Sequence, residues 1–255
     1  MFLVSYPFTL VPCPFSVLIC CFKFTNMNQE NTQTDLSVSA EIKLYYDLFV
    51  PENLVDPAPL LLAVHGYGAH KRYMMREARA VAPADFVIAS VQAPHQHFRQ
   101  TESGFKIGFG WLTDFKSEES VAVHHDFLLQ VIENLVSRNL IDRNKIFLYG
   151  FSQACALNFR FAFTNPEIPR GILAVCGGIP SDLQNNEKYQ PFAAQTFYLY
   201  GNNDEFYPLE KFQNYERSLK EILPHFHSKQ YPATHVINDE MREDMKKWLV
   251  VNGEQ

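Results

Sequence analysis

The sequence predicts an α/β fold, a mostly parallel central sheet with helices on both faces, from three observations. Strand-like and helix-like segments alternate from residue 40 onward. Several of the strand-like segments are short, continuous apolar runs, which is typical of strands buried on both faces. There is no internal repeat after residue 40, and no Gly/Ser-rich or Pro-rich linker. Such alternation favours parallel strands joined by crossover helices, so we expect a single domain over residues 27–255.

The strands are expected where apolar residues alternate or run together. Residues 42–48 alternate between apolar and other side chains, as in a strand with one buried face. Residues 60–64 and 86–91 are continuous apolar runs. Further strands are predicted at residues 145–149, 171–175 and 196–200, and around His225 and His227.

The helices are expected where apolar residues recur with a period near 3.6. Ser117, followed by Glu118 and Glu119, begins a long helix in which apolar residues keep this spacing up to Val136. Further helices are predicted at residues 153–163, 209–223 and 238–251. Most of these segments lie between strands, where crossover connections are required.

Composition excludes several classes of protein. With 22 basic and 28 acidic residues among 255, the formal net charge is −6, and 47% of residues are hydrophobic. A largely disordered chain is therefore excluded. The acidic balance, without a long Lys/Arg run, argues against nucleic acid or an anionic membrane as a partner. A small-molecule substrate is the expected partner.

The first 22 residues form an apolar head without any charged residue, 16 of them apolar. Three interpretations are open for residues 1–26: upstream sequence read through before a natural start at Met27, an atypical signal or membrane anchor, or a packed extension. Three prolines would break the first half of a spanning helix, and no basic segment precedes the apolar run. A membrane partner is expected only if this head is an anchor.

From Met27 onward only Cys155 and Cys176 remain, too few for a disulfide framework. A cytoplasmic location is therefore expected, with export or anchoring as the alternative.

Ser152 is the first candidate for chemistry. In a sheet of this kind, ligands bind at the carboxyl ends of the strands. Ser152 follows a predicted strand through Gly150 and Phe151 and precedes a predicted helix. Such a tight turn lifts a hydroxyl out of the sheet, beside backbone N–H groups. A Gly-x-Ser-x-Ala pentapeptide alone is weak and also fits an ordinary turn, but its place between strand and helix favours a nucleophile.

A serine nucleophile requires a base, and a carboxylate that orients the base. In this type of sheet the order along the chain is Ser, then Asp or Glu, then His. Asp204 follows Ser152 at the end of a predicted strand, and His235 comes later, just before the last helix. Glu205 and Asp182 are the rivals of Asp204, which could also be a surface turn residue.

His235 is preferred among nine histidines because of this chain order. Seven of the others have alternative interpretations. His65 is expected to be a structural ring, and His95 and His97 to border the pocket. His124 and His125 are expected on a helix far from the strand ends, and His225 and His227 on a partly exposed strand. No metal or other cofactor is expected, because the His-x-His pairs lack ligand partners at suitable spacing. The glycine-rich residues 104–110 do not match a phosphate-binding loop.

Four segments together carry a resemblance to a known family: His65-Gly66-Tyr67-Gly68, Gly150-Phe151-Ser152-Gln153, Gly201-Asn202-Asn203-Asp204, and His235. From about residue 40 to about residue 250, the chain resembles the phospholipase/carboxylesterase family of α/β-hydrolases, which includes acyl-protein thioesterases, lysophospholipases and small bacterial carboxylesterases. The resemblance implies the α/β-hydrolase fold. It also implies that Ser152 is the nucleophile, His235 the general base and acid, and Asp204 the orienting carboxylate.

The resemblance also implies how substrate is held. Tyr67 and Gln153 would offer backbone N–H groups to an oxyanion. Phe109, Trp111 and Phe115 occupy the position of an aromatic stretch that lines the acyl pocket, with plain core packing as the alternative. The implied activity is hydrolysis of short-to-medium acyl esters through an acyl-enzyme. The same triad would serve an acyl-thioesterase, a lysophospholipase or an acyltransferase, whereas the complete Ser, Asp and His set disfavours a non-catalytic binding module.

Two segments depart from the family pattern. Ala154 and Cys155 stand where two glycines are usual, and Cys155 is expected to need more room and to shift the helix slightly. The run Ala69-His70-Lys71-Arg72 is more basic than usual. It is expected to be a solvated charge patch, with attraction of an anionic substrate group as the alternative.

Overall fold

The computed structural model describes residues 33–54 and 57–254. The chain divides into two units, residues 1–42 and residues 43–255. In the first unit, the described residues 33–42 form no helix or strand. The apolar head at residues 1–26, with its three open interpretations, lies outside the described residues. Within the described part of the chain, no helix is both long and apolar enough to cross a membrane.

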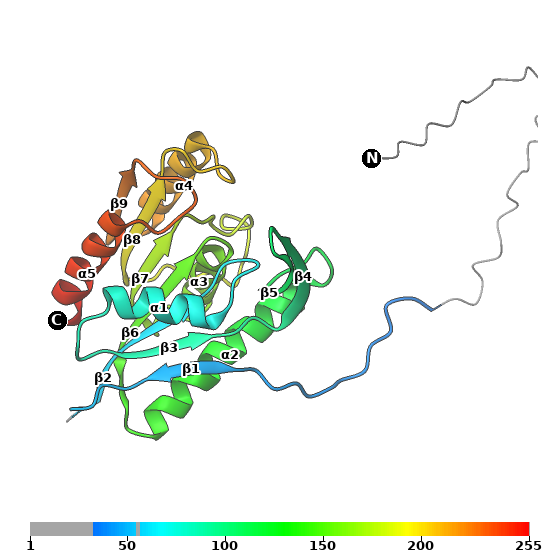
Figure 1. Ribbon diagram of the computed structural model, residues 1–255, viewed down its shortest axis with the longest axis horizontal. Coiled ribbons are helices and arrows are strands. Elements are labelled where there is room, and N and C mark those ends of the chain that lie inside the picture. The colour runs from blue at the N-terminus through cyan, green and yellow to red at the C-terminus, as the bar shows by residue number, and fades with distance from the viewer. Residues whose placement is uncertain (1–32, 55–56, 255) are drawn as a thin grey trace, which may run out of the picture. The chain divides into compact units, whose positions relative to one another are not determined.

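Seven strands of the second unit form one sheet, in the order β1-β3-β2-β6-β7-β8-β9 (Figure 1). Only β1 is antiparallel to its neighbour, so the expected mostly parallel sheet is confirmed. The strands of this sheet are β1 (Tyr46–Phe49), β2 (Ala58–Val64), β3 (Val87–Val91), β6 (Ile141–Phe151), β7 (Pro169–Val175), β8 (Gln195–Gly201) and β9 (Phe226–Tyr231).

Helices cover both faces of the sheet because its central strands are apolar on both sides. In β2, Leu60 and Leu62 pack against one helix layer, while Leu61 and Ala63 pack against the other. Complete burial of one leucine contributes about 1.5–3 kcal/mol. The helices are α1 (Lys71–Val81) and α5 (Asp239–Gly253) on one face, and α2 (Ser117–Ser137), α3 (Gln153–Thr164) and α4 (Leu209–Ile222) on the other (Figure 1).

Two features were not predicted from the sequence. Helix α1 buries Met74, Glu77, Ala78 and Val81, so only three of its buried residues are apolar and the fourth is charged. A separate two-stranded hairpin consists of β4 (His95–Thr101) and β5 (Gly104–Gly110). Most of its side chains are exposed, and therefore no alternation of buried and exposed residues marks it.

The strand order brings two loops to the same edge of the sheet. Strand β2 lies between β3 and β6 and is parallel to both. The chain continues from β2 to β3 on one side of β2, and β6 is later added on the other side. Such a switch point leaves a crevice at the carboxyl ends of the two central strands. Residues Gly66 and Tyr67 follow β2, and Ser152 follows β6, at this position.

Candidate active site

Ser152 occupies the sharp turn between β6 and α3 that its sequence position predicts. Its backbone has φ 56° and ψ −119°, and its N–H donates to the Val175 carbonyl oxygen at 2.9 Å. A non-glycine residue at positive φ costs about 1–3 kcal/mol and is retained only where surrounding structure enforces it. The turn therefore presents Ser152 Oγ above the sheet edge.

Gly177, just after β7, makes room for this turn. A Cβ at residue 177 would lie 2.2 Å from the Ser152 carbonyl oxygen and 2.4 Å from Cys155 Sγ. The larger Cys155 is thus accommodated by a glycine on the neighbouring strand end. Its thiol is fully buried and donates to the Gly150 and Val175 carbonyl oxygens at 3.3 Å each. Burial raises the pKa of the Cys155 thiol strongly, which disfavours a thiolate nucleophile.

Ser152, His235 and Asp204 form a continuous hydrogen-bonded chain. His235 Nδ1 lies 2.7 Å from Asp204 Oδ2, and His235 Nε2 lies 2.9 Å from Ser152 Oγ. An ionised carboxylate only accepts hydrogen bonds, so Nδ1 carries the imidazole proton and Nε2 accepts from the serine hydroxyl. Three residues separated by up to 83 positions in the sequence therefore meet in the order that nucleophilic catalysis requires.

The carboxylate of Asp204 is fixed by the loop that follows it. Its Oδ1 accepts hydrogen bonds from the backbone N–H groups of Phe206 and Tyr207, each at 2.9 Å, which leaves Oδ2 for His235. Glu205, a rival in the sequence, instead accepts from the His235 backbone N–H at 2.9 Å. That hydrogen bond lowers the pKa of Glu205. Asp182, the other rival, forms an ion pair with Arg160.

The predicted oxyanion donors, Tyr67 and Gln153, lie on two loops that other residues hold in place. The Gly68 N–H donates to the Phe109 carbonyl oxygen of β5 at 2.8 Å, and the Tyr67 ring stacks on His97 at 4.6 Å between centroids. The Gln153 side chain accepts from the Trp111 backbone N–H at 3.0 Å. Gln153 is the first residue of α3, so its own N–H has no helical acceptor.

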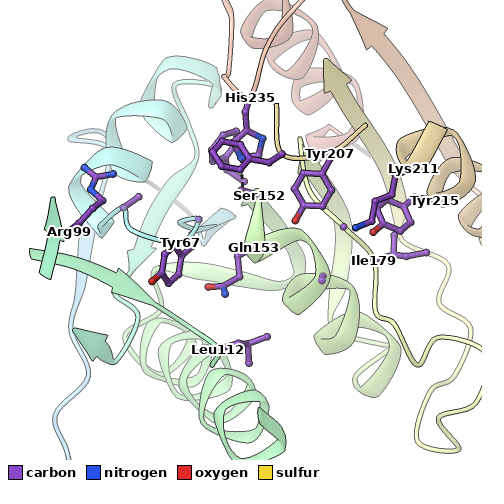
Figure 2. A pocket seen from close by; sticks show the side chains of 16 residues that line it. Tyr67, Arg99, Leu112, Ser152, Gln153, Ile179, Tyr207, Lys211, Tyr215 and His235 are labelled. Atoms are coloured by element: carbon purple, nitrogen blue, oxygen red, sulfur yellow. Dashed lines mark hydrogen bonds between the residues drawn. The ribbon is translucent and has the colours of Figure 1, made fainter. Parts of the chain in front are cut away.

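A pocket of about 680 Å³ opens beside Ser152 (Figure 2). Its apolar lining includes Leu112, Ala156 and Ile179. Aromatic residues surround the imidazole of His235, whose ring lies 4.9 Å from that of Phe151 and 4.8 Å from that of Phe206. A pocket of this size can hold a small organic ligand.

The aromatic residues predicted to line the pocket lie elsewhere. Trp111 is 1% exposed and packs in the core, where its Nε1 donates to the His65 carbonyl oxygen at 2.8 Å. Phe109 packs partly against the same core, and Phe115 is exposed. Leu112, the residue after Trp111, reaches the pocket instead (Figure 2). Local packing thus assigns Trp111 to supporting the loop after β2.

His65 supports that loop as a neutral ring, which agrees with the predicted structural role. Its Nδ1 donates to the Gly66 carbonyl oxygen at 2.7 Å, and its Nε2 accepts from the Ala93 backbone N–H at 3.1 Å. Burial lowers the pKa of His65 from 6.5 to about 4. His95 and His97 lie on β4, and the His97 ring stacks on the Tyr67 ring.

The basic run after Gly68 does not line the pocket beyond Ala69. Lys71 pairs with Asp47, and the His70 side chain caps α1 by accepting from the Tyr73 N–H at 3.3 Å. The charged residues that do line the pocket, Arg99 and Lys211, come from β4 and α4. No sequence motif marked either one. Within residues 33–54 and 57–254, no group of three or more His, Cys, Asp or Glu residues is arranged to hold a metal ion.

Comparisons with known proteins agree with this architecture. The family model described as Phospholipase/Carboxylesterase matches residues 47–252. The putative esterase NocK of Nocardia uniformis subsp. tsuyamanensis is 25% identical over 162 residues, which are 62% of this chain, and the match spans only 43% of that relative. The crystal structure of esterase PE8 superposes with a TM-score of 0.66 at 17% identity, covering 82% of this chain and 99% of that one. Acyl-protein thioesterase 2 of Zea mays gives a TM-score of 0.61 at 14% identity, covering 82% and 98%.

The fold and the arrangement of its strand-end loops define an α/β-hydrolase. The chain belongs to the phospholipase/carboxylesterase family, because the family model spans most of its length. The resemblance stated from the sequence is thereby confirmed.

Proposed function

We propose that this protein is a serine carboxylic-ester hydrolase that acts on short-to-medium acyl esters through an acyl-enzyme. The observation that carries the proposal is the Ser152–His235–Asp204 chain, with 2.9 Å and 2.7 Å between the paired atoms. The strained turn at Ser152 supports it, because strain at such a turn commonly accompanies function.

In the first half of the reaction, Ser152 Oγ attacks the ester carbonyl carbon while His235 Nε2 takes the hydroxyl proton. Asp204 stabilises the imidazolium and keeps its orientation. The Tyr67 and Gln153 amides stabilise the oxyanion of the tetrahedral intermediate, a contribution of about 3 kcal/mol per donor. Collapse of the intermediate expels the alcohol, which receives its proton from His235.

In the second half, water attacks the acyl group on Ser152 while His235 Nε2 takes a proton from the water. The carboxylic acid then leaves, and Ser152 recovers its proton from His235. The apolar residues Leu112, Ala156 and Ile179 suit a short-to-medium acyl chain. A thioester or a lysophospholipid would react by the same steps, and an acyltransferase would replace water by an alcohol or thiol acceptor.

The test is Ser152→Ala assayed on 4-nitrophenyl esters of increasing acyl length, together with labelling by a fluorophosphonate probe. We expect hydrolysis to fall by at least about 10⁴-fold, because the nucleophile is lost. Labelling should disappear as well, and the far-UV circular dichroism spectrum should be unchanged. Cys155→Ala is the control, because its buried thiol has no role in the mechanism. A Ser152→Ala protein that retains full activity or labelling would overturn the proposal.

A further inference from the structure

Two cations line the pocket, and no carboxylate lines it. Arg99 and Lys211 lie at opposite ends of the pocket, with Ser152 between them (Figure 2). Neither forms an ion pair with a carboxylate among the described residues. The whole chain has 28 acidic and 22 basic residues, so its formal net charge is −6. The charged side chains that line the pocket are therefore both cationic, although the protein as a whole is acidic.

Lys211 is an exposed side chain that lies against two aromatic rings near the reacting groups. Its ammonium lies 5.3 Å from the ring centre of Tyr207 and 5.9 Å from that of Tyr215. The Tyr207 ring in turn lies 6.0 Å from the imidazole of His235. A single aromatic ring thus separates the ammonium from the catalytic imidazole, a spacing that a small substrate can bridge.

Helix α4 adds to the positive potential at this point. Lys211 is in the first turn of α4, and its N–H bonds to the Pro208 carbonyl oxygen at 2.8 Å. The N-terminal end of a helix carries partial positive charge, so a cation there is disfavoured unless an anion compensates it. Glu210 precedes Lys211 in the same turn but does not line the pocket.

Lys211 also connects two cavities. A second pocket of about 500 Å³ shares Ile179, Lys211 and Tyr215 with the first. Lys211 is the one charged side chain among its lining residues, all of which lie in the described part of the chain. Lys211 therefore lies where the two cavities adjoin.

We propose that the pocket selects esters that carry a carboxylate or phosphate group, and that Lys211 binds this anion. The inference rests on the proposed esterase function and specifies its substrate class. Bound anion would pair with the Lys211 ammonium and lie against the positive end of α4. The rings of Tyr207 and Tyr215 would keep the ammonium next to the pocket.

The test compares substrates of equal length that differ in charge. The acyl pair is 4-nitrophenyl pentanoate and mono-4-nitrophenyl glutarate, and the alcohol pair is phenyl acetate and 3-carboxyphenyl acetate. For at least one pair, we expect the wild-type kcat/KM to favour the anionic ester by about tenfold, and Lys211→Gln to abolish that ratio. A tenfold ratio corresponds to about 1.4 kcal/mol. The preference should also weaken as salt concentration rises.

Two variants serve as comparisons. Lys220→Gln, an exposed lysine in the last turn of the same helix, should keep the wild-type ratio. Arg99→Gln should reduce the ratio less than Lys211→Gln does. Equal kcat/KM values for the anionic and neutral esters in the wild type would overturn the assignment of Lys211 as the anion-binding residue. A preference for the anionic ester that Arg99→Gln removes and Lys211→Gln does not would overturn it too.

A measurement without turnover separates this inference from the proposed esterase function. Glutarate should raise the melting temperature of Ser152→Ala protein more than uncharged glutaramide does, and Lys211→Gln should remove the difference. If no ester is hydrolysed but glutarate still stabilises the protein through Lys211, the esterase proposal fails and the anion site stands. If esters are hydrolysed and glutarate has no effect, the anion site fails alone.

Discussion

The two acidic residues beside His235 have distinct tasks although they are adjacent in sequence. Asp204 is 9% exposed and meets the imidazole through Oδ2, whereas Glu205 binds the backbone N–H of His235. Composition and chain order leave both as candidates, because each could follow the strand end. The direction in which each side chain leaves the loop decides between them, and that direction follows from the Asp204 hydrogen bonds to Phe206 and Tyr207.

Replacing these two carboxylates by amides should separate their tasks. Asp204→Asn should lower kcat by roughly 10³–10⁴-fold, because an amide no longer enforces the required tautomer or stabilises the imidazolium. Glu205→Gln keeps an acceptor for the His235 N–H and should change kcat by only a few-fold. Steady-state kinetics on one nitrophenyl ester measures both. Equal losses in the two variants would contradict the assignment of Asp204.

Among the elements, the β4–β5 hairpin gives the clearest case of a segment whose role depends on packing. Its glycine-rich residues 104–110 do not match a phosphate-binding loop. In the fold, Gly108 lies against the backbone of Gly68, next to Tyr67, and the Phe109 carbonyl oxygen accepts from the Gly68 N–H. The missing side chain permits a close approach of hairpin and loop. The hairpin therefore sets the position of one proposed oxyanion donor.

Adding a methyl group at this contact should disturb catalysis more than folding. A Cβ at residue 108 would lie 3.0 Å from Gly68 Cα, so in Gly108→Ala the loop must move by a few tenths of an ångström. We expect kcat to fall by roughly tenfold, since displacements near 1 Å can cost about 10²-fold. Gln100→Ala, an exposed change in β4, is the control. Unchanged kcat in Gly108→Ala would indicate that the hairpin does not position the loop.

The stability of the whole molecule should depend on histidines that the fold keeps neutral. Burial lowers the pKa of His65 and of His125 to about 4 each, and that of the fully buried His124 well below 6.5. The unfolded chain therefore binds more protons than the folded protein between pH 6.5 and pH 4. The contribution of these neutral histidines to the free energy of unfolding is fully present above pH 6.5 and is lost as the pH falls from 6.5 to 4.

Urea unfolding between pH 7 and pH 4 measures this loss. His65 alone should account for about 3 kcal/mol of it by pH 4, given its pKa of about 4. His65→Gln should flatten the profile, whereas His225→Gln, at an exposed position, should leave it as in the wild type. A free energy of unfolding that stays constant or rises toward pH 5 would contradict the prediction.

The sequence by itself determined the type of fold and the three residues proposed for catalysis. Short continuous apolar runs between turn residues are typical of central strands, and the order Ser152, Asp204, His235 matches strand ends that meet at one edge. The tertiary structure decided what depends on contacts between distant segments. It directed Trp111 into the core, placed Leu112 in the pocket, and brought Arg99 and Lys211 from separate elements to its ends. The period of apolar residues in a segment predicts which of its side chains face the core. The residues that line a pocket depend instead on how loops and helices pack together.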